Sequence, residues 1–262
     1  MTERLRRAVN GAVLRLTLVD DATRNSLSEA MLAELSLALA QAQSNASISV
    51  IIIAAQGTAF CSGHNLKELT SHRTDLDKGQ AYFAKLFGMC AEVMLAINQH
   101  RCAVIAEVDG LASAAGCQLV ATCDLAYASS RAGFCTPGVN IGLFCSTPLV
   151  PLSRSVGSKQ AMEMLLMGGV HDADFAFRSG LINGIVAQNE LSSHVNGLAE
   201  TIAAKSQAAI GYGKRLFYEQ RNLGLKDAYA LASGVMVQNM LDGAACEGLD
   251  AFINKRNPQW PV

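Results

Sequence analysis

The chain has 262 residues, of which 50% are hydrophobic and 16% are charged, and its formal net charge is −1. This composition supports a large buried core in one large or two small domains, and the dispersed Lys and Arg residues give no reason to expect a nucleic-acid partner. An apolar run such as residues 50–55 is too short to span a membrane, and the N-terminal segment lacks the apolar stretch of a secretory signal, so no membrane partner is expected.

The cysteines contain no C-x-x-C pair, so we expect neither a zinc site nor a thioredoxin-type site, and no bound metal. Most of them stand in apolar surroundings, as small buried residues do. Free thiols are typical of reducing compartments, so we predict a cytoplasmic location. The eight cysteines are Cys61, Cys90, Cys102, Cys117, Cys123, Cys135, Cys145 and Cys246.

The first part of the chain predicts a hairpin and a helix. Residues 5–19 are expected to form the hairpin, because Asn10-Gly11 is a strong signal for a two-residue loop and apolar residues alternate after it. An S-x-x-E capping box at Ser26 predicts a helix that continues to about Gln43.

The next part predicts a strand, a glycine-containing loop and a long helix. Residues 49–55 are apolar and β-branched, as in a strand buried on both faces. Residues 57–69, GTAFCSGHNLKEL, form the loop, and the polar residues 70–79 read as a mobile segment. Residues 80–100 predict a helix. Its inward side chains are expected to be Phe83, Phe87, Cys90, Met94 and Ile97.

The stretch from Val104 to Gly142 is the centre of the pattern. Val104–Val108 predicts a buried strand, and Asp109-Gly110 predicts a turn. Small residues then precede a helix that starts at about Gly116. Such residues let backbone N–H groups approach a ligand closely, and a helix N-terminus adds positive partial charge. They are also typical of a tight turn packed against a sheet.

Several segments resemble the enoyl-CoA hydratase/isomerase (crotonase) superfamily. VDGLASAAGCQLVATCD and FCTPGVNIG are similar to that family's V-N-G-x-A-x-G-G-G-C-E-L-x-x-x-C-D and F-x-x-P-E-x-x-x-G motifs. GTAFCSGHNLKEL resembles its first signature loop, and EGLDAFINKRNPQW resembles its C-terminal end, so the resemblance runs from about residue 9 to residue 260. It is closest to the enoyl-CoA hydratase domain-containing protein 3 group, on the segments SGHNLKEL, AAGCQLVATCD and TPGVNIGLFCSTP.

The resemblance implies an α/β fold, the crotonase (ClpP/crotonase-like) spiral of repeated ββα units with a C-terminal helical region. We expect residues 1–195 to form the acyl-CoA-binding core and residues 196–262 to form a helical trimerisation region. Relatives pack this region on a neighbouring subunit, so the resemblance predicts a homotrimer or a hexamer.

The resemblance also implies an oxyanion hole, in which two backbone N–H groups bind the oxygen of a thioester enolate. These donors map to His64 and Ala115. Ala114 and Ala115 stand where the family has glycine, and their methyl groups are tolerable if φ is negative. The family's two catalytic glutamates map to Gln118 and Gly138, so the acid–base groups of an ordinary hydratase are missing.

Other side chains are candidates to replace the missing carboxylates. His64 titrates near neutral pH, and the remaining candidates lie on segments that can reach the pocket. The candidates are His64, His72, Asp75, Asn140 and Cys145.

The ligand implied is a coenzyme A thioester, bound as substrate, with no separate cofactor. Arg24 and Lys255 match basic positions of the family's motifs and are expected to contact the CoA phosphates, although exposed basic residues are more often plain solvated charge. Ala59, Cys61 and Leu66 are expected to line the track of the adenine and the pantetheine.

We therefore expect an acyl-CoA-binding enzyme of the hydratase/isomerase type, a lyase or isomerase of fatty acid metabolism that stabilises a thioester enolate without the ordinary hydratase mechanism. The alternative is a non-catalytic acyl-CoA-binding or assembly protein. An intact oxyanion hole favours the enzyme, whereas the loss of both carboxylates favours the alternative.

Overall fold

The computed structural model describes residues 3–261 and contains two β-sheets. One sheet has six strands in the order β1-β2-β3-β5-β7-β10, and the other has four in the order β4-β6-β8-β9. The strands are β1 (Leu5–Asn10), β2 (Val13–Leu18), β3 (Val50–Ala55), β4 (Ala59–Cys61), β5 (Ala103–Val108), β6 (Leu111–Ser113), β7 (Leu125–Ser129), β8 (Gly133–Cys135), β9 (His171–Asp172) and β10 (Gly184–Val186).

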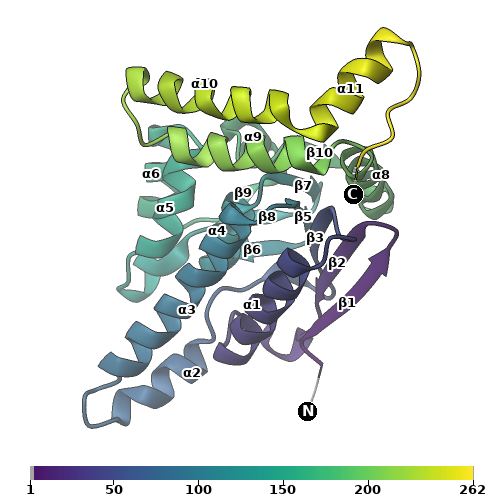
Figure 1. Cartoon of the computed structure of the whole chain (residues 1–262). Coiled ribbons are helices and arrows are strands. Elements are labelled where there is room, and N and C mark those ends of the chain that lie inside the picture. Colours follow the sequence, from purple (N-terminus) through teal and green to yellow (C-terminus); the bar gives the residue numbers. More distant parts are fainter. Residues whose placement is uncertain (1–2, 262) are drawn as a thin grey trace.

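Helices connect and surround these strands (Figure 1). Three short 3₁₀ helices are η1 (Asp21–Thr23), η2 (His72–Thr74) and η3 (Pro137–Ile141). The α-helices are α1 (Glu29–Ser44), α2 (Leu66–Ser71), α3 (Gln80–Gln99), α4 (Ala115–Thr122), α5 (Ser146–Ser155), α6 (Ser158–Met167), α7 (Ala173–Ser179), α8 (Leu191–Ala203), α9 (Gln207–Gln220), α10 (Leu225–Leu241) and α11 (Gly243–Ile253).

The repeating unit of the fold is one strand from each sheet followed by helix. β3, β5 and β7 are adjacent parallel strands of the larger sheet, and each is followed along the chain by a strand of the smaller sheet, namely β4, β6 and β8. Helices then return the chain to the next repeat (Figure 1). The predicted α/β arrangement of repeated ββα units is therefore confirmed.

The N-terminal hairpin forms as predicted, with its loop displaced by one residue. Asn10 pairs with Val13, so the two-residue loop is Gly11-Ala12 rather than Asn10-Gly11. Gly11 has a φ of 55°, and a positive φ at the first loop residue is the arrangement of a type II′ turn.

The first helix begins later than its capping box predicted. Ser28 is the N-cap, and its hydroxyl accepts a hydrogen bond from the Met31 N–H at 3.3 Å. Ser26 instead lies buried before the helix. Arg24 and Asn25 have left-handed φ values of 55° and 56°, and this turn moves the start of α1 along the chain.

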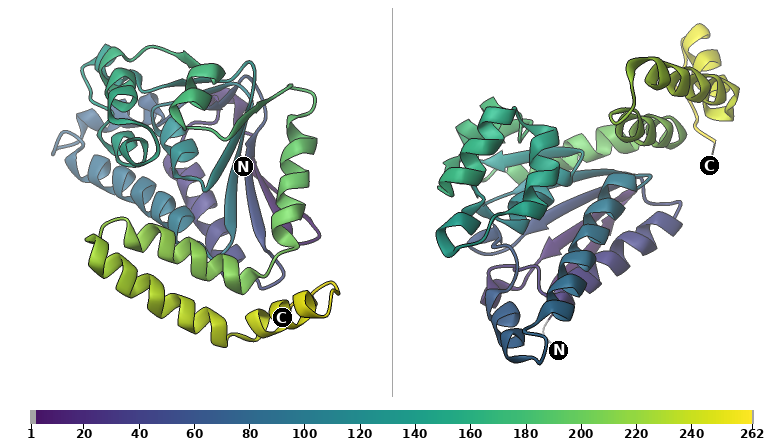
Figure 2. Two further views of the ribbon diagram at one scale, coloured as in Figure 1. Left: turned by 90° about the horizontal axis from the view of Figure 1, so that it is seen from above. Right: turned by 90° about the vertical axis from the view of Figure 1, so that its left-hand side faces the viewer.

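The C-terminal helices form a layer that is fastened to the core by buried polar contacts. Lys214 of α9 donates to the carbonyl oxygens of Ile97 and Cys102, each at 2.9 Å. Asp124 accepts from Lys214 at 2.6 Å and from the Tyr218 hydroxyl at 2.8 Å. Helices α10 and α11 lie on the outer side of α9, away from the sheets (Figure 2).

Helix α8 differs from the later helices because it packs directly on the larger sheet. Leu191, Val195 and Ala199 of α8 share a hydrophobic cluster with side chains of β3 and β5. The predicted division between residues 195 and 196 falls inside this helix. The C-terminal layer that does not pack directly on the larger sheet begins with α9.

Within the described residues, α3 is the one helix long and apolar enough, by length and composition, to cross a membrane. Helices of a folded core meet the same criterion. Here α3 packs against α1 through side chains of the main hydrophobic core.

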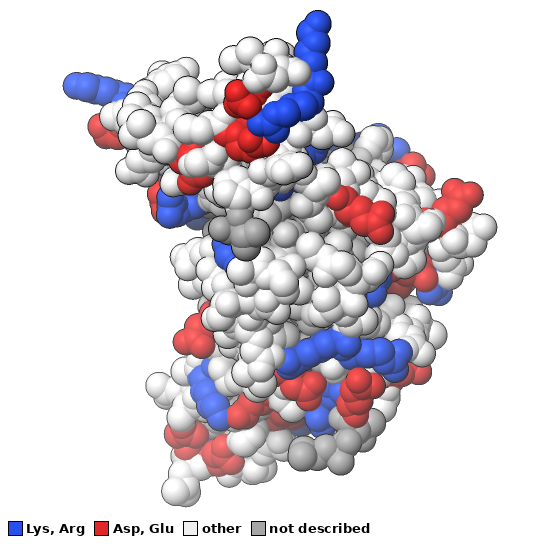
Figure 3. Space-filling model, turned by 45° about the vertical axis from the view of Figure 1, so that its right-hand side comes forward, with Lys and Arg blue, Asp and Glu red and all other residues white. Residues whose placement is uncertain are grey.

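Charged side chains of both signs are interspersed on the face shown in Figure 3. They gather toward two ends of the molecule, and a largely uncharged band lies between them. Because the formal net charge is only −1, long-range steering by a field of one sign is not expected.

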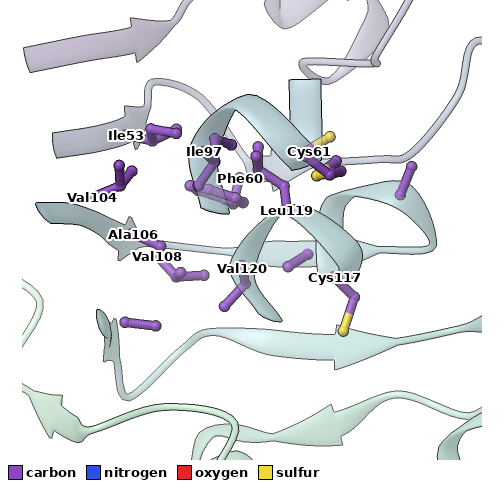
Figure 4. Close-up of a cluster of buried hydrophobic side chains, with 14 of the residues drawn as sticks. Ile53, Phe60, Cys61, Ile97, Val104, Ala106, Val108, Cys117, Leu119 and Val120 are labelled. Carbon is purple, nitrogen blue, oxygen red and sulfur yellow. The ribbon is translucent and has the colours of Figure 1, made fainter. Parts of the chain in front are cut away.

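Strand β3 is buried on both faces, and its alternate side chains enter two different cores. Ile51 joins the core covered by α1, α3 and α4, whereas Ile52 joins the cluster under α8. Figure 4 shows part of the first core, in which Phe60 of β4 lies near Ile97 of α3 and Leu119 of α4. Each such buried side chain contributes about 1.5–3 kcal/mol, so this packing holds β4 and α4 firmly in place.

Candidate active site

The loops that follow β4 and β6 meet beside the smaller sheet. β4 pairs with β6 in parallel, so the chain leaves both strands at the same edge of the sheet. After β4 it runs through residues 62–65 into α2, and after β6 it runs through Ala114 into α4. The sheet therefore brings the loop of His64 next to the start of α4 at Ala115.

Two glycines allow these loops to touch. Gly63 has a φ of +89°, and a Cβ on it would lie 3.0 Å from the Ser113 carbonyl oxygen and 3.4 Å from the Ala115 nitrogen. A Cβ on Gly116 would overlap the carbonyl oxygen of Cys61. The contact between the loops therefore requires glycine at both positions.

The segment before α1 holds the first loop in place. The Leu27 N–H donates to the Gly63 carbonyl at 2.8 Å, and the Ser62 N–H donates to the Arg24 carbonyl at 3.1 Å. The fully buried Asn25 donates through Nδ2 to two backbone carbonyls around β4, each at 2.9 Å. The loop after β4 and the segment before α1 thus form one hydrogen-bonded unit.

Neither the His64 nor the Ala115 backbone N–H donates to an acceptor within residues 3–261. Ala115 is the first residue of α4, where N–H groups lack partners inside the helix and carry positive partial charge. Unpaired donors in adjoining loops provide what an oxygen with growing negative charge requires. The role of these donors in an oxyanion hole stays a prediction.

Ala114 carries backbone strain at the start of α4. Its φ is 48° and its ψ is −113°, a conformation that costs an alanine about 1–3 kcal/mol. The condition of a negative φ is therefore not met at Ala114, whereas Ala115 is not among the residues with positive φ. The Ala114 N–H donates to the Cys135 carbonyl at 2.9 Å, and its carbonyl accepts from the Gln118 N–H at 3.0 Å. These neighbours hold the strained turn.

The His64 side chain is partly buried beside the loops. Its Nδ1 lies 3.1 Å from the Leu27 carbonyl oxygen, and because a carbonyl only accepts, Nδ1 carries the proton of the neutral ring. Nε2 is buried and has no hydrogen-bond partner in the described part of the chain. Burial lowers the pKa of His64, against the opposing effects of Leu27 and Glu68. The ring is therefore neutral near pH 7, with Nε2 as its unprotonated nitrogen.

Phe87 is a site residue whose position the sequence did not reveal. It was expected to point into the core, but it is 40% exposed and meets the His64 ring edge-on, with 5.3 Å between ring centroids. Helical spacing indicates only which face of α3 carries Phe87, and that face borders the site as well as the core.

Gln118 lies one helical turn after Ala115 on α4. It is only 4% exposed, and its Oε1 has no hydrogen-bond partner among residues 3–261. An unsatisfied buried amide oxygen costs about 1–3 kcal/mol. The amide is thus prepared to bind a water or a polar group of a ligand, but it cannot transfer a proton by titration.

Gly138 of η3 is buried and has little space around it. A Cβ there would lie 2.9 Å from the Leu143 carbonyl oxygen and 3.0 Å from the Cys145 Sγ. The Leu143 N–H donates to the Gly138 carbonyl at 2.9 Å, which closes the turn. The surrounding backbone therefore occupies the space through which a side chain would leave this position.

Among the candidate replacement groups, the structure brings one to Gly138. Cys145 lies against it, and burial raises the pKa of the Cys145 thiol. His72 of η2 is instead bonded through Nδ1 to Asp75 at 2.8 Å, and Asn140 donates to a backbone carbonyl. Within residues 3–261 no three His, Cys, Asp or Glu side chains are grouped so as to hold a metal ion.

The predicted CoA-binding residues are spread over the molecule. Arg24 is exposed next to the first loop, and Leu66 is exposed at the start of α2. Ala59 and Cys61 are buried, and their place along the track of the adenine and the pantetheine stays a prediction. Lys255 follows α11, which lies at the opposite end of the molecule from α2 (Figure 1). One chain therefore does not bring Lys255 to the loop.

A cavity of about 850 Å³ opens beside Gln118, between α3, α4, α5 and α9. Its volume falls within the range of small-molecule sites. Met94 and Val150 supply apolar surface, whereas Asn98 and Tyr218 supply polar groups. Gln118 is the predicted site residue that this cavity reaches.

Comparison with known proteins identifies close relatives. The family model described as enoyl-CoA hydratase/isomerase matches residues 8–261. "Enoyl-CoA hydratase domain-containing protein 3, mitochondrial" of Rattus norvegicus is 44% identical over 248 residues, which cover 95% of this chain and 81% of the relative. The protein of the same name from Homo sapiens is also 44% identical, over 95% of this chain and 80% of the relative.

Solved structures of such proteins share the fold. The crystal structure of an enoyl-CoA hydratase from Mycobacterium smegmatis has a TM-score of 0.93 and 45% identity, and the match covers 99% of each chain. The crystal structure of human enoyl Coenzyme A hydratase domain-containing protein 3 has a TM-score of 0.94 and 42% identity, over 98% of this chain and 100% of that one. The resemblance stated from the sequence and the fold that it implied are both confirmed.

The predicted cytoplasmic location is contradicted by these relatives. The rat and human proteins, and those from Mus musculus and Xenopus laevis, are named as mitochondrial. All eight cysteines are free in the structure, but free thiols indicate only a reducing environment and do not identify the compartment.

Proposed function

The chain belongs to the enoyl-CoA hydratase/isomerase family, and we propose that it binds an acyl-CoA with the thioester oxygen between the backbone N–H groups of His64 and Ala115. The observation that carries this proposal is the contact between the two loops. Gly63 has a φ of +89°, at which a side chain is strained, and a Cβ on it would lie 3.0 Å from the Ser113 carbonyl oxygen. Both N–H groups lack a protein acceptor within residues 3–261.

These donors favour chemistry that places negative charge on the thioester oxygen. When a proton leaves the carbon next to the thioester, the electron pair moves toward that oxygen and an enolate forms. Fixed N–H donors stabilise this charge without rearranging, and one such donor is typically worth about 10²–10³ in rate. The N-terminal position of Ala115 on α4 adds the partial charge of the helix.

Proton transfer is the weak point of the proposed reaction. Hydration needs one group to take a proton from water and another to deliver one to carbon, and each contributes about 10²–10⁴. Gln118 can orient water but cannot accept its proton, and Gly138 offers no side chain. We therefore expect very slow hydration of enoyl-CoA, with the unprotonated Nε2 of His64 as the remaining candidate base.

The second candidate function is acyl-CoA binding without turnover. It is favoured by the crowding at Gly138, where the Leu143 carbonyl and Cys145 fill the space that a carboxylate side chain would need. A protein selected only to hold a thioester would tolerate that change. Turnover measured alongside binding separates the two functions.

Calorimetry with matched CoA ligands tests the proposal. Acetoacetyl-CoA should bind more tightly than free CoA and more tightly than an S-alkyl-CoA thioether, which lacks the carbonyl oxygen. Equal affinity for the thioester and the thioether would refute the use of these N–H groups, and no binding of any ligand at millimolar concentration would refute the whole proposal.

Ala115→Pro provides a variant for the same measurement. It removes one N–H at the first residue of a helix, where proline is accepted. The affinity for the thioester should fall strongly, and the affinity for free CoA should change little. Since proline also restricts the residue before it and Ala114 is already strained, a melting curve must show that the variant is folded.

A further inference from the structure

The cavity beside Gln118 extends away from the loops along two helices. On α3, Phe87 touches the His64 ring, and Ala91, Met94 and Asn98 follow at helical spacings of four, three and four residues as lining of the cavity. Residues at such spacings share one face of a helix. That face therefore leads from the proposed thioester site into the cavity.

Helix α4 gives the same direction. Gln118 and Thr122 line the cavity and lie three and seven residues after Ala115, on the same face. At 1.5 Å per residue this path is about 10 Å long. An acyl chain whose carbonyl oxygen lies at Ala115 would pass Gln118 and enter the cavity.

The charged side chains at the far end of the cavity are unequally paired. The cavity is lined by three charged residues, Asp124, Arg154 and Arg221. Asp124 is already bonded to Lys214 and to Tyr218. Neither arginine forms a salt bridge within the described residues. The uncompensated charge that faces this cavity is therefore positive.

Local contacts hold both guanidinium groups at the rim. Arg154 donates to the Val150 carbonyl at 3.0 Å, and Arg221 donates to the carbonyl of Arg154. The Arg221 guanidinium also lies 5.3 Å from the centre of the Phe217 ring. These bonds to carbonyl oxygens at the end of α5 occupy one N–H group of each arginine. A guanidinium has five N–H donors, so each retains donors for a ligand.

We propose that this cavity binds the acyl chain of a dicarboxylic acid thioester, with the free carboxylate at the chain end held by Arg154 and Arg221. The middle of the chain would contact the apolar side chains of α3 and α5, such as Met94 and Val150. Guanidinium groups bind carboxylates through paired, charge-assisted hydrogen bonds. This inference rests on the proposed function, because the thioester must lie at His64 and Ala115.

The test compares acyl-CoA ligands that differ only in the terminal group. Hexanoyl-CoA and adipoyl-CoA have six-carbon chains, and octanoyl-CoA and suberoyl-CoA have eight. Calorimetry with the wild-type chain at low ionic strength should show a dicarboxylic preference of about 5- to 20-fold within at least one pair. The preference should shrink at high ionic strength, because these arginines are exposed.

Arginine variants locate the effect. Arg154→Gln and Arg221→Gln should each lower the preference, and the double variant should abolish it, while affinity for hexanoyl-CoA and free CoA changes little. Arg178→Gln is the matched control, because Arg178 is an exposed helical arginine outside the cavity. If Arg221→Gln does not fold, Arg221→Lys, which keeps the charge, should retain part of the preference.

The outcomes separate this inference from the proposed function. If acyl-CoAs bind more tightly than free CoA but the dicarboxylic forms have no advantage in the wild-type chain, the inference is overturned and the proposed function stands. A preference unchanged in the double arginine variant also overturns it. If no acyl-CoA binds more tightly than free CoA, both fail.

Discussion

Gln118 and Gly138 mark the positions of the two missing carboxylates, but they differ in what a new carboxylate would meet. Gln118 has the shape of glutamate and already lies buried beside the cavity. Gly138 is enclosed by the Leu143 carbonyl and Cys145. Gln118→Glu replaces only the amide nitrogen by an oxygen. Gly138→Glu requires the backbone around Leu143 to move.

Gln118→Glu should therefore raise the slow hydration of crotonyl-CoA, by at most about 10²–10⁴, whereas Gly138→Glu should mainly lower the melting temperature. A stopped assay of hydration and a circular dichroism melt measure the two effects. Gln160→Glu, at an exposed position on α6, is the control that should leave the rate unchanged. Wild-type turnover near 10 s⁻¹, a typical enzyme median, would contradict this picture and point to another base, with His64→Ala as the next variant.

His100 gives a residue-scale prediction about pH. It is 3% exposed, its Nε2 donates to the Leu39 carbonyl at 3.2 Å, and its Nδ1 accepts from the Cys102 N–H at 3.0 Å. Burial, with smaller contributions from Lys214 and Arg101, lowers the pKa of His100 from 6.5 to about 4. The neutral ring is therefore the form that the folded state accommodates.

Because this pKa is lower in the folded state, the stabilisation is complete above pH 6.5 and is lost as the pH falls toward 4. The free energy of unfolding should decline by up to about 3 kcal/mol across this range. Urea titrations at several pH values measure it. His100→Gln should flatten the decline, and His194→Gln, at an exposed position on α8, should not. An unchanged pH profile in His100→Gln would rule out this residue as the cause.

At the scale of elements, the start of α4 combines strain with an unpaired donor. Ala114 has its left-handed φ directly before the Ala115 N–H, and the β6–α4 turn is pressed against Gly63 of the neighbouring loop. The turn thus orients the donor by contacts on both sides. The backbone strain at Ala114, which accompanies this orientation, lowers the stability of the folded chain.

Ala114→Gly should stabilise the chain. Glycine removes about 1–3 kcal/mol of strain at this φ and loses about 0.4–1 kcal/mol through the more flexible unfolded chain. The expected net gain of about 1 kcal/mol corresponds to a rise of roughly 2–4 °C in melting temperature. Ala121→Gly, inside the same helix, should instead destabilise by about 1 kcal/mol. A lower melting temperature for Ala114→Gly would show that the turn is not strained.

At the scale of the whole molecule, the C-terminal layer exposes apolar side chains that one chain does not cover. Helix α10 contributes Leu225, Tyr229, Met236 and Met240, which are 76%, 67%, 61% and 48% exposed. Exposed apolar surface gathered on one element is typical of a protein–protein interface. Helix α10 lies on the outer side of α9 (Figure 2), where a second copy of the chain can reach it.

The family resemblance predicts a trimer or a multiple of three in solution, and we expect the copies to meet at this exposed face. Tyr229→Lys combined with Met236→Lys should shift the chain toward smaller species, because charges would have to be buried in the interface. Light scattering at micromolar concentration measures the mass. Leu76→Lys, at a fully exposed position between η2 and α3, should leave it unchanged. A wild-type chain that is monomeric under these conditions would contradict the expectation.

The elements and their order were accessible from the sequence. The apolar, β-branched run at residues 49–55 forms β3, the run at Val104–Val108 forms β5 to within one residue, and the small residues before Gly116 end at the start of α4. These features depend on local preferences and on alternation, which neighbouring residues carry in their own order. The donors at His64 and Ala115 were assigned through the resemblance to two short family motifs, and their role stays a prediction.

Only the tertiary structure decided the features that depend on segments distant in the chain. The left-handed φ of Ala114 is stabilised by its hydrogen bond to the Cys135 carbonyl. The lack of space at Gly138 results from the turn that follows it, and Phe87 borders the site because its ring contacts that of His64. The cavity has the same origin, since four helices enclose it and Lys214 of α9 is bonded to Asp124, 90 residues earlier. A sequence pattern records which residues are neighbours along the chain, whereas these properties arise from which atoms become neighbours in space.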